Sequence, residues 1–468
     1  MIKFSILKIS FLAFCIVLVF GCANQLPPTG GDDDTTPPRV LKITPSKNTL
    51  NYKGNTVEID FDEYVDRRSL KDAMFISPKP LGELNYNWSG KSVEIEFPKE
   101  LQKNTTYSFV IGKSLKDIHG NYITAPIQFA FSTGPSIDNG KISGKVYTSK
   151  SENLMIFAYI NRGGDDSLMN PGKKFPDFFT QVDENNKFYF NHLPKEKFRL
   201  FALKDNNKNL LYDIGADEIT VLNDDIKIED TVTNYPANFL FSDYIVPDDY
   251  VYSEKYIPSL KCIDTIDYLF TSLKDYEVNV PIDSRFVFYF KKNKLSRFDI
   301  AENMKLVDTA SKKITRLFYN WASDSVLEVT TIDELKYSSV QKFIFDLKNT
   351  PAKYYNERVF TVADERKTGN VTGKILNYDV TVPYAIKIYN QNSKLIYYYR
   401  FLENDSAFTF KKIPEGQYLL FGFVDANKNR AYDFGVAYPF KPSEKFFIFE
   451  PMLNLKGGWN IENVFIKF

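Results

Sequence analysis

The chain has 468 residues, 16% of them aromatic, with 59 basic and 59 acidic side chains. This length favours several domains rather than one. The balanced charge offers no basic surplus that would indicate a nucleic-acid partner, so we expect none. The 41 Phe and 30 Tyr, against only 22 Gly, favour packed β-sheet over disorder.

The first 21 residues have the pattern of a secretory signal peptide. Lys3 and Lys8 precede an apolar stretch over residues 9–20, which is shorter than the roughly 20 apolar residues that a membrane-spanning helix needs. The stretch ends in LVFGC, which resembles the lipobox of bacterial lipoproteins. That resemblance implies cleavage before Cys22 and lipid attachment to its thiol. An ordinary signal peptide followed by an incidental cysteine is the alternative.

The remaining cysteines and the next segment agree with this interpretation. Cys15 leaves with the signal peptide, so Cys262 is the one cysteine beside Cys22 in the mature chain, and no internal disulfide is expected. Residues 22–36 are rich in Pro, Gly, Thr and Asp, which predicts a flexible, solvated tether. No second apolar run has membrane length, so lipid is the membrane anchor that the sequence offers.

Short alternating runs begin after the tether. Each run is bounded by residues typical of turns, and no long helical period appears. This spacing predicts antiparallel β-sandwiches. The first four runs are TVEIDF (56–61), SVEIEF (92–97), TYSFVI (106–111) and IQFAFS (127–132).

Internal repeats indicate the domain organisation. Residues 188–215 align with 408–435 at a constant offset of 220, and each copy follows a similar strand start, ISGKV at 142–146 and VTGKI at 371–375. A fainter pair, residues 84–97 and 317–330, shares Tyr-Asn-Trp followed by a Ser-Val strand.

The repeats predict an all-β chain of four tandem sandwiches in the order A–B–A′–B′. Each unit has the normal size of a sandwich domain. The predicted ranges are 37–136 for unit A, 137–242 for unit B, 243–365 for the divergent unit A′ and 366–468 for unit B′.

The units resemble two known kinds of module. VEIDFDEYVD (57–66), LQKNTTYSFVIG and SLKDIHGN (114–121) make unit A similar to bacterial Ig-like domains of the S-layer-associated type, whereas unit A′ matches less well. IPEGQYLL (413–420) makes units B and B′ resemble transthyretin-like modules of the carboxypeptidase-regulatory type. The whole plan resembles Ig-like-domain lipoproteins of Bacteroidota. That resemblance implies an outer-membrane location, with the periplasmic face and the cell surface both open.

A polar loop occurs once in each of units B and B′, as DNNKNLLYD and DANKNRAYD. Oxygen ligands at alternate positions suit a hard cation, and these loops resemble the first nine positions of calcium loops. The expected ligands are side chains, completed by one backbone carbonyl in each loop. They are Asp205, Asn207, Asn209, Asp213 and the carbonyl of Leu211 in unit B, and Asp425, Asn427, Asn429, Asp433 and the carbonyl of Ala431 in unit B′.

The loops also depart from an EF-hand. Ala216 and Val436 stand where the bidentate Glu belongs, and Leu210 stands at the place of the usual Gly. Structural calcium held weakly, in the range of about 10⁻⁴–10⁻³ M, is therefore one interpretation. Metal-free turns in which Asp and Asn side chains bond nearby backbone groups are the other. In both cases the loop is expected to be scaffold.

Catalytic motifs are missing from the sequence. Its two histidines, His119 and His192, stand in different units, and the chain has no Gly-x-Ser-x-Gly, Walker or His-Glu-x-x-His motif. We therefore expect no enzyme and no catalytic residue. The acidic run GDDD (31–34) resembles surface-export signals, with a solvated linker as the alternative. YYYRF (397–401) and FFIF (446–449) are interpreted as strand cores or as an interdomain or partner interface.

Three functional hypotheses remain. The first is a non-catalytic, lipid-anchored envelope protein that acts as a structural, adhesive or docking module for a protein or glycan partner. The second is an accessory lipoprotein that binds a glycan or peptide with an aromatic sheet face, which predicts two or three coplanar exposed rings. The third is a hydrolase with an unrecognised pair of close, buried carboxylates.

Overall fold

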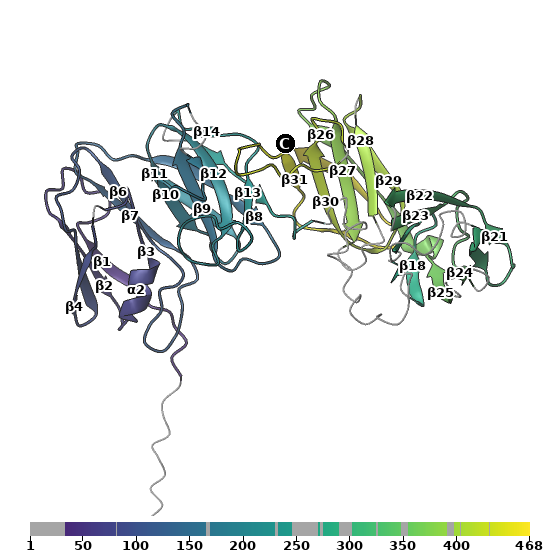
Figure 1. Ribbon diagram of the computed structural model, residues 1–468, viewed down its shortest axis with the longest axis horizontal. Helices are drawn as coiled ribbons and strands as arrows, with labels where there is room; N and C mark the ends of the chain where they lie inside the picture. Colours follow the sequence, from purple (N-terminus) through teal and green to yellow (C-terminus); the bar gives the residue numbers. More distant parts are fainter. Residues whose placement is uncertain are drawn as a thin grey trace, which may run out of the picture.

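The computed structural model describes residues 33–80, 82–164, 169–229, 233–245, 270–271, 275–289, 302–323, 326–347, 354–390, 397–402, 404–429 and 431–468. The predicted signal peptide, Cys22 and most of the predicted tether lie outside these residues. Within them the chain folds into four β-sandwich units, each with its own apolar core (Figure 1). No helix among the described residues has the length and apolar character needed to cross a membrane.

Unit A is a sandwich of a four-stranded and a three-stranded sheet. The first has the order β1 (Val40–Thr44), β2 (Thr56–Phe61), β5 (Ser92–Glu96) and β4 (Asn85–Ser89), and the second has the order β3 (Met74–Ser77), β6 (Thr106–Ile111) and β7 (Ile127–Ser132). The alternating runs predicted from the sequence are thus strands β2, β5, β6 and β7. One short helix, α2 (Arg67–Ala73), connects the sheets; it begins where the Asp66 side chain accepts the backbone N–H groups of Arg68 and Ser69.

Unit B is also a sandwich of two sheets, a longer one and a shorter one, around its apolar core. The longer sheet contains β10 (Phe178–Gln181), β9 (Leu154–Ile160), β12 (Lys197–Lys204) and β13 (Glu218–Val221), with β14 (Ile226–Lys227) beside β12. The shorter sheet contains β11 (Lys187–Leu193), β8 (Gly140–Tyr147) and β15 (Asn234–Pro236), with β16 (Phe239–Leu240) beside β8.

Unit B′ repeats this topology. Its longer sheet contains β28 (Tyr397–Leu402), β27 (Tyr384–Asn390), β30 (Gly416–Val424) and β31 (Phe446–Ile448), with β32 (Leu453–Leu455) beside β30. Its shorter sheet contains β29 (Ala407–Pro414), β26 (Thr368–Leu376) and β33 (Asn460–Lys467).

The last strand of each repeat pairs in parallel with the first, a departure from the purely antiparallel sheets that the alternation predicts. Strands β15 and β16 run parallel to β8, and β33 runs parallel to β26. The glycine shared by ISGKV and VTGKI permits this close approach. A Cβ on Gly144 would lie 1.9 Å from the Ala237 carbonyl oxygen, and one on Gly373 would lie 2.2 Å from that of Val464.

Unit A′ has a sheet that corresponds to the four-stranded sheet of unit A. Its order is β17 (Phe270–Thr271), β19 (Arg285–Tyr289), β23 (Val326–Thr331) and β22 (Leu317–Ser323), so the two Tyr-Asn-Trp segments lie on equivalent edge strands, β4 and β22. The second sheet contains β18 (Glu277–Val280), β25 (Tyr354–Val362), β24 (Val340–Leu347), β20 (Met304–Asp308) and β21 (Ile314–Thr315). A 3-10 turn, Glu365–Lys367, leads into unit B′.

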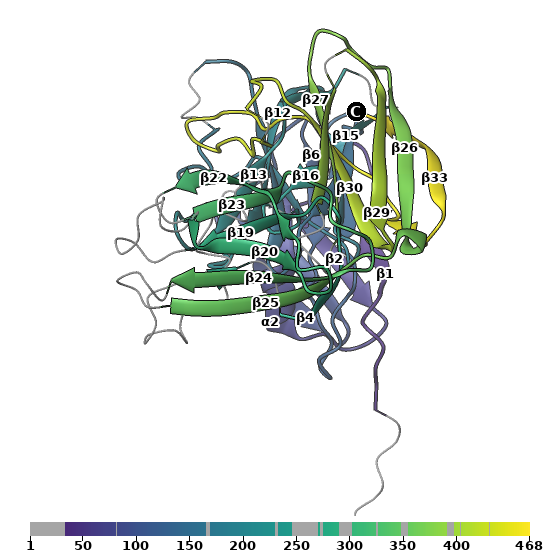
Figure 2. The same cartoon turned by 90° about the vertical axis from the view of Figure 1, so that its right-hand side faces the viewer.

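The order of the units in space differs from their order along the chain. Figure 1 shows unit A at one end, then unit B, then unit B′, and unit A′ at the other end. Figure 2 shows the strands of unit A′ running across the direction of those of unit B′. The chain therefore passes from unit B to the far end before it returns to build the unit that contacts unit B.

Units B and B′ share a buried aromatic interface. The outer face of β27 and β30 in unit B′ packs against side chains of unit B, and the rings of Tyr147 and Phe446 lie 5.9 Å apart. The buried residues of this cluster are Tyr147 and Leu240 from unit B, Ile245 from the segment that follows it, and Ala385, Tyr389, Leu419, Phe421, Phe423, Tyr432 and Ile448 from unit B′.

The contact is reciprocal, because unit B′ also covers the outer face of β9 and β12. Ala437 and Phe440 of unit B′ pack in a second cluster with Phe157, Tyr159 and Phe201 of unit B. Backbone bonding joins the units as well, since the Ser443 N–H donates to the Leu222 carbonyl at 3.2 Å. Covered faces explain why β9 reads LMIFAYI without polar alternation.

Candidate metal centre and the repeated loops

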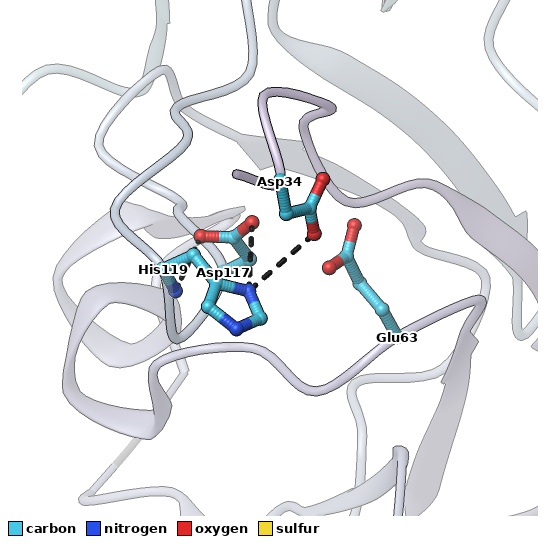
Figure 3. A group of neighbouring side chains, drawn as sticks. All are labelled: Asp34, Glu63, Asp117 and His119. Atoms are coloured by element: carbon cyan, nitrogen blue, oxygen red, sulfur yellow. Dashed lines mark hydrogen bonds and ion pairs between the residues drawn. The ribbon is translucent and has the colours of Figure 1, made fainter. Parts of the chain in front are cut away.

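Four side chains from three segments converge at the end of unit A where the described chain begins (Figure 3). Asp34 precedes β1, Glu63 lies between β2 and α2, and Asp117 and His119 lie in the turn between β6 and β7. One potential ligand atom from each lies within 4.8 Å of the others. We refer to these four residues as the tether-end cluster.

Asp117 organises the cluster from within. Its carboxylate is almost fully buried and accepts the backbone N–H groups of His119 and Asn121 at 2.8 Å each, together with the Asn121 side-chain amide at 2.8 Å. Burial alone would raise the pKa of Asp117, but the hydrogen bonds from Asn121 and its neighbours outweigh it and lower that pKa. The turn formed by SLKDIHGN is thus held in shape by its own aspartate, Asp117.

Asp34 is fastened to this turn. The Asn121 side-chain amide donates to the Asp34 carbonyl at 2.9 Å, and His119 Nδ1 lies 3.4 Å from Asp34 Oδ2. The Asp34 carboxylate also accepts the backbone N–H and the hydroxyl of Thr36, and these bonds lower its pKa. These contacts fix the point at which the mature chain enters unit A.

Glu63 completes the cluster, and its surroundings disfavour the charged form of its carboxylate. Burial raises the pKa of Glu63, and the negative charges of Asp117 and Asp34 raise it further. Three carboxylates and one imidazole form a donor set suited to Mn²⁺ or Zn²⁺. Carboxylate oxygens carry two lone pairs each, so the bonds to Asn121 and Thr36 do not exhaust their capacity as ligands.

The cluster went unpredicted because its members are far apart in the sequence. The structure places His119 in a turn, exposed, beside two carboxylates. The available signal was the acidic turn of VEIDFDEYVD together with SLKDIHGN, two motifs that the fold brings together through the Val65–Asp117 bridge. His192 lies elsewhere, with Nδ1 3.3 Å from the Asp138 carbonyl oxygen, and burial lowers its pKa.

The loop of unit B is closed by its own hydrogen bonds. Asp205 is buried and accepts the backbone N–H groups of Asn209 at 3.2 Å and Leu210 at 2.9 Å. The side-chain amides of Asn207 and Asn209 both donate to Asp213 Oδ2, at 2.7 and 2.8 Å. The predicted ligands Asp205, Asn207, Asn209 and Asp213 thus come together, with Leu211 donating its N–H to Asn209 Oδ1 at 2.9 Å.

The loop of unit B′ has the same bonding pattern. Asp425 accepts the Asn429 N–H at 3.0 Å, Asn427 and Asn429 both donate to Asp433 Oδ2, and Asn429 Oδ1 accepts the Ala431 N–H at 2.8 Å.

At the sixth position of the first loop, Leu210 has a φ of 59°, a conformation that glycine adopts more easily. The EF-hand glycine is thus replaced in sequence while its backbone conformation is kept.

A second carboxylate accepts backbone N–H groups of each loop. The alignment of the two repeats does not reveal this carboxylate. In unit B, Asp217 accepts the backbone N–H groups of Asn206 at 2.9 Å and Asp213 at 2.8 Å. In unit B′, Glu444 accepts those of Ala426 at 2.9 Å and Asp433 at 3.1 Å. Burial raises the pKa of Glu444 to about 7, and the nearby Asp433 and Asp425 add to the shift.

A hard cation fits the repeated loops only after a local rearrangement. As they stand, the amides direct Nδ2 rather than Oδ1 at Asp213 and Asp433. A half-turn of each amide would turn two amide oxygens toward the carboxylate in each loop, but it would also break the bonds in which Asn209 Oδ1 and Asn429 Oδ1 accept the N–H groups of Leu211 and Ala431. Hydrogen bonding alone also satisfies both loops, so the geometry accommodates each of the two interpretations made from the sequence.

The other predicted sites lie mostly in strands. Cys22 is outside the described residues, as are the side chains of Tyr397, Tyr398 and Tyr399. Phe401 and Phe446 pack against the interface between units B and B′, so these two aromatic residues belong to an interdomain contact.

Comparison with known proteins identifies one module. Residues 34–133 match the family model described as a bacterial Ig-like domain. This match covers unit A and includes the whole tether-end cluster. No curated protein matches the chain.

Solved structures show only remote similarity. The chain is 12% identical to L,D-transpeptidase LdtMt1 in complex with imipenem, covers 44% of that chain with 23% of its own, and the TM-score is 0.18. For domains 1–6 of surface layer protein SbsC the identity is 8%, the coverage 90% of this chain and 68% of that one, and the TM-score 0.18. For BcpA, the major pilin subunit of Bacillus cereus, the identity is 10% and the TM-score 0.16. That match covers 70% of this chain and 99% of the pilin chain. Scores this low do not bear on what the chain does.

Proposed function

We propose that this protein is a non-catalytic, lipid-anchored component of a bacterial cell envelope that acts as a structural or partner-docking module. The observation that carries the proposal is the packing of units B and B′, which joins the two halves of the chain. Unit A is bonded to unit B through Gln128 and the Tyr189 carbonyl, and unit A′ to unit B′ through Glu334 and Lys412. A spacer needs such contacts, because a partner held at unit A′ is then kept at a set distance from the tether at unit A.

The buried carboxylates support a non-catalytic role. Asp117, Asp205 and Asp217 each accept backbone N–H groups that would otherwise lack a partner, and Glu444 does the same in unit B′. Groups bound in this way shape turns. The hydrolase hypothesis needs two close, buried carboxylates, and in the tether-end cluster Asp117 is buried whereas Glu63 is half-buried and Asp34 is exposed. The aromatic-face hypothesis needs coplanar exposed rings, for which the described residues give no evidence.

The repeated loops belong to this proposal as weak structural calcium sites. Each lies beside the interface between units B and B′: Leu210 and Tyr212 pack in one of its clusters, and Tyr432 packs in the other. Calcium bound there would stiffen the segments that hold the two units together. Calcium is available outside the cytoplasm at the concentrations that such sites require.

Lipid anchoring is tested in cells that export the protein. The wild-type chain should incorporate a labelled fatty acid and fractionate with membranes, and Cys22→Ala should lose both properties while still being made. Label retained in Cys22→Ala, or wild-type protein recovered without lipid, would contradict the anchor.

The spacer role is tested separately on purified mature chain. Cys22→Ser and Cys262→Ser are combined with Lys42→Cys and Lys313→Cys, two exposed positions in units A and A′, and spin labels at these positions report the distance distribution. The rigid arrangement predicts one narrow distribution. A broad distribution in the intact chain would show independent units and would overturn the spacer role.

A further inference from the structure

We propose that the tether end of unit A is a membrane-contact surface, in which Tyr64, Ile118 and Tyr122 enter the interfacial region of the lipid bilayer. The proposal rests on the lipid anchor proposed above and adds to it a surface of the folded protein. We refer to these three residues as the contact triad.

The contact triad is apolar, exposed and contiguous. The exposed fractions are 53% for Tyr64, 60% for Ile118 and 55% for Tyr122. The Ile118 N–H donates to the Tyr64 carbonyl at 3.2 Å, and Tyr122 is opposite Lys116 in a β-bridge. Two adjacent loops therefore present the three side chains at one end of the sandwich.

Basic side chains flank the two tyrosines. Lys91 Nζ lies 5.9 Å from the ring centroid of Tyr64, and Lys116 Nζ lies 5.6 Å from that of Tyr122. Tyrosine rings favour the headgroup level of a bilayer, and lysines beside them can reach lipid phosphates. The pairing of each exposed ring with an ammonium group matches the chemistry of a phospholipid interface.

The anchor delivers the membrane to this end of the molecule. Asn121, between Ile118 and Tyr122, holds Asp34 through the Asp34 carbonyl, so the chain enters the fold next to the contact triad. Asp34 lies twelve positions after Cys22. The intervening segment reaches at most about 40 Å and averages about 20 Å as a flexible chain. The surface beside Asp34 is consequently kept near the bilayer at high effective concentration.

The carboxylates of the tether-end cluster limit the strength of this contact. Asp117 has a fully buried side chain, whereas the side chain of Asp34 is one-third exposed. Their charge opposes anionic headgroups, whereas Lys91 and Lys116 favour them. We therefore expect a contact too weak to recruit untethered protein, which becomes occupied once the chain is anchored.

The test uses the full mature chain, with Cys22→Ser and Cys262→Ser and an N-terminal hexahistidine in place of the lipid. The chain is held on vesicles of phosphatidylethanolamine, phosphatidylglycerol and a nickel-chelating lipid. An environment-sensitive fluorophore is attached at Ile118→Cys, or at Val380→Cys as a matched control that is 70% exposed in unit B′. Because attachment is chemical, the result does not depend on whether cells lipidate Cys22.

The expected result is a blue shift and protection from an aqueous quencher for the label at position 118, both absent at position 380. A label at Thr124→Cys, an exposed position near the triad, should show a smaller shift that disappears in Tyr64→Ser/Ile118→Ser/Tyr122→Ser. If that variant melts earlier than the parent, Tyr64→Ser/Tyr122→Ser replaces it.

Two outcomes would overturn the proposal. One is an unchanged spectrum at position 118 on vesicles that demonstrably retain the protein. The other is a shift at position 118 that appears without vesicles and grows with protein concentration, because the contact triad would then bind a second copy of the chain. Equal shifts at positions 118 and 380 would also overturn the proposal, because they would show that the protein turns no preferred face to the bilayer.

Discussion

The guanidinium of Arg199 in unit B lies over the ring of Phe440 in unit B′, with Cζ 3.8 Å from the ring centroid. Asp225 holds the same guanidinium through two hydrogen bonds of 2.9 and 3.0 Å. Arg199 is buried, so its charge is neutralised by Asp225 on one side while its flat face contacts an aromatic ring from the other unit. This contact joins the two halves of the chain, and the first two predictions concern its surroundings.

Phe440→Ala should weaken the joint between units B and B′. The half-buried ring contacts both Arg199 and Phe201, so its removal should lower the free energy of unfolding by about 2 kcal/mol. Chemical denaturation measures the loss, and spin labels in units A and A′ should report a broader distance distribution. Phe465→Ala is the matched control, because Phe465 is 46% exposed on β33 and its loss should cost no more than about 0.5 kcal/mol. Similar costs for the two variants would contradict the role of Phe440.

Gly435→Ala should destabilise the chain more than Gly215→Ala does, although the two glycines are equivalent in the repeat. Both have positive φ angles, 72° and 88°, so each alanine should incur about 1 kcal/mol of backbone strain. A Cβ on Gly435 would also lie 2.5 Å from Val221 Cγ2 of unit B and 2.5 Å from the Lys441 carbonyl oxygen of its own unit, while one on Gly215 would meet nothing within 4 Å. The overlap should add about 1–3 kcal/mol. Equal melting temperatures for the two variants would contradict tight packing around Gly435.

Glu444 should make stability depend on pH. Burial raises its pKa from 4.5 to about 7 in the folded chain. Between these values the folded chain binds more protons than the unfolded chain, so the contribution of Glu444 to stability falls as pH rises from about 4.5 to about 7. Glu444→Gln carries no charge at any pH, and it should flatten this part of the profile in denaturation experiments.

The control for this pH effect is Glu462→Gln, at an exposed position of the same unit. It removes one carboxylate without touching the loop, so its profile should follow that of the wild type. A Glu444→Gln profile that keeps the wild-type slope between pH 4.5 and 7 would assign that slope to other groups.

Calcium should stabilise the mature chain through the repeated loops. At ten times the dissociation constant, two independent sites would each add about 1.4 kcal/mol. The melting temperature should therefore rise in millimolar calcium and return with chelator, and calorimetry should detect binding. Asp213→Asn/Asp433→Asn removes the negative charge from the shared acceptor of each loop and should abolish both signals.

The control for calcium is Asp405→Asn, at an exposed turn outside both loops, which should leave the calcium response intact. Absence of both heat and thermal shift in the wild-type chain would identify the loops as metal-free turns. Their hydrogen bonds would then account for the repeated Asp and Asn residues by themselves.

Local pattern was enough to predict the strands and their repetition. The runs at 56–61, 106–111 and 127–132 are strands β2, β6 and β7 with those bounds, because period-two alternation directly reflects a sheet with one buried face. The same reasoning could not say what covers a strand that is apolar on both sides. For β9 the cover combines side chains of its own unit with Phe75 of unit A and with Ala437 and Phe440 of unit B′. For β27 it includes side chains of unit B. Side-chain pattern carries no information about the identity of such neighbours.

Two other features could not be predicted from the sequence. One is the convergence of side chains from distant segments, and the other is a carboxylate that occupies different positions in the two repeats. Asp34, Glu63 and Asp117 meet only because three loops close over one end of a sandwich, and no spacing rule links them. Glu444 was missed for a different reason. The offset of 220 maps Asp217 onto Ala437, and the longer loop of unit B′ supplies its carboxylate seven residues later.

The packing between units B and B′ has a consequence for how the chain can be divided. Residues 22–242 expressed alone would lack Ala437 and Phe440, which pack over β9 and β12, and would expose Tyr147 and Leu240, which pack against unit B′. Residues 366–468 expressed alone would expose the aromatic outer face of β27 and β30. Each half should therefore be less soluble alone than in the intact chain, and mixing the two halves should restore the contact.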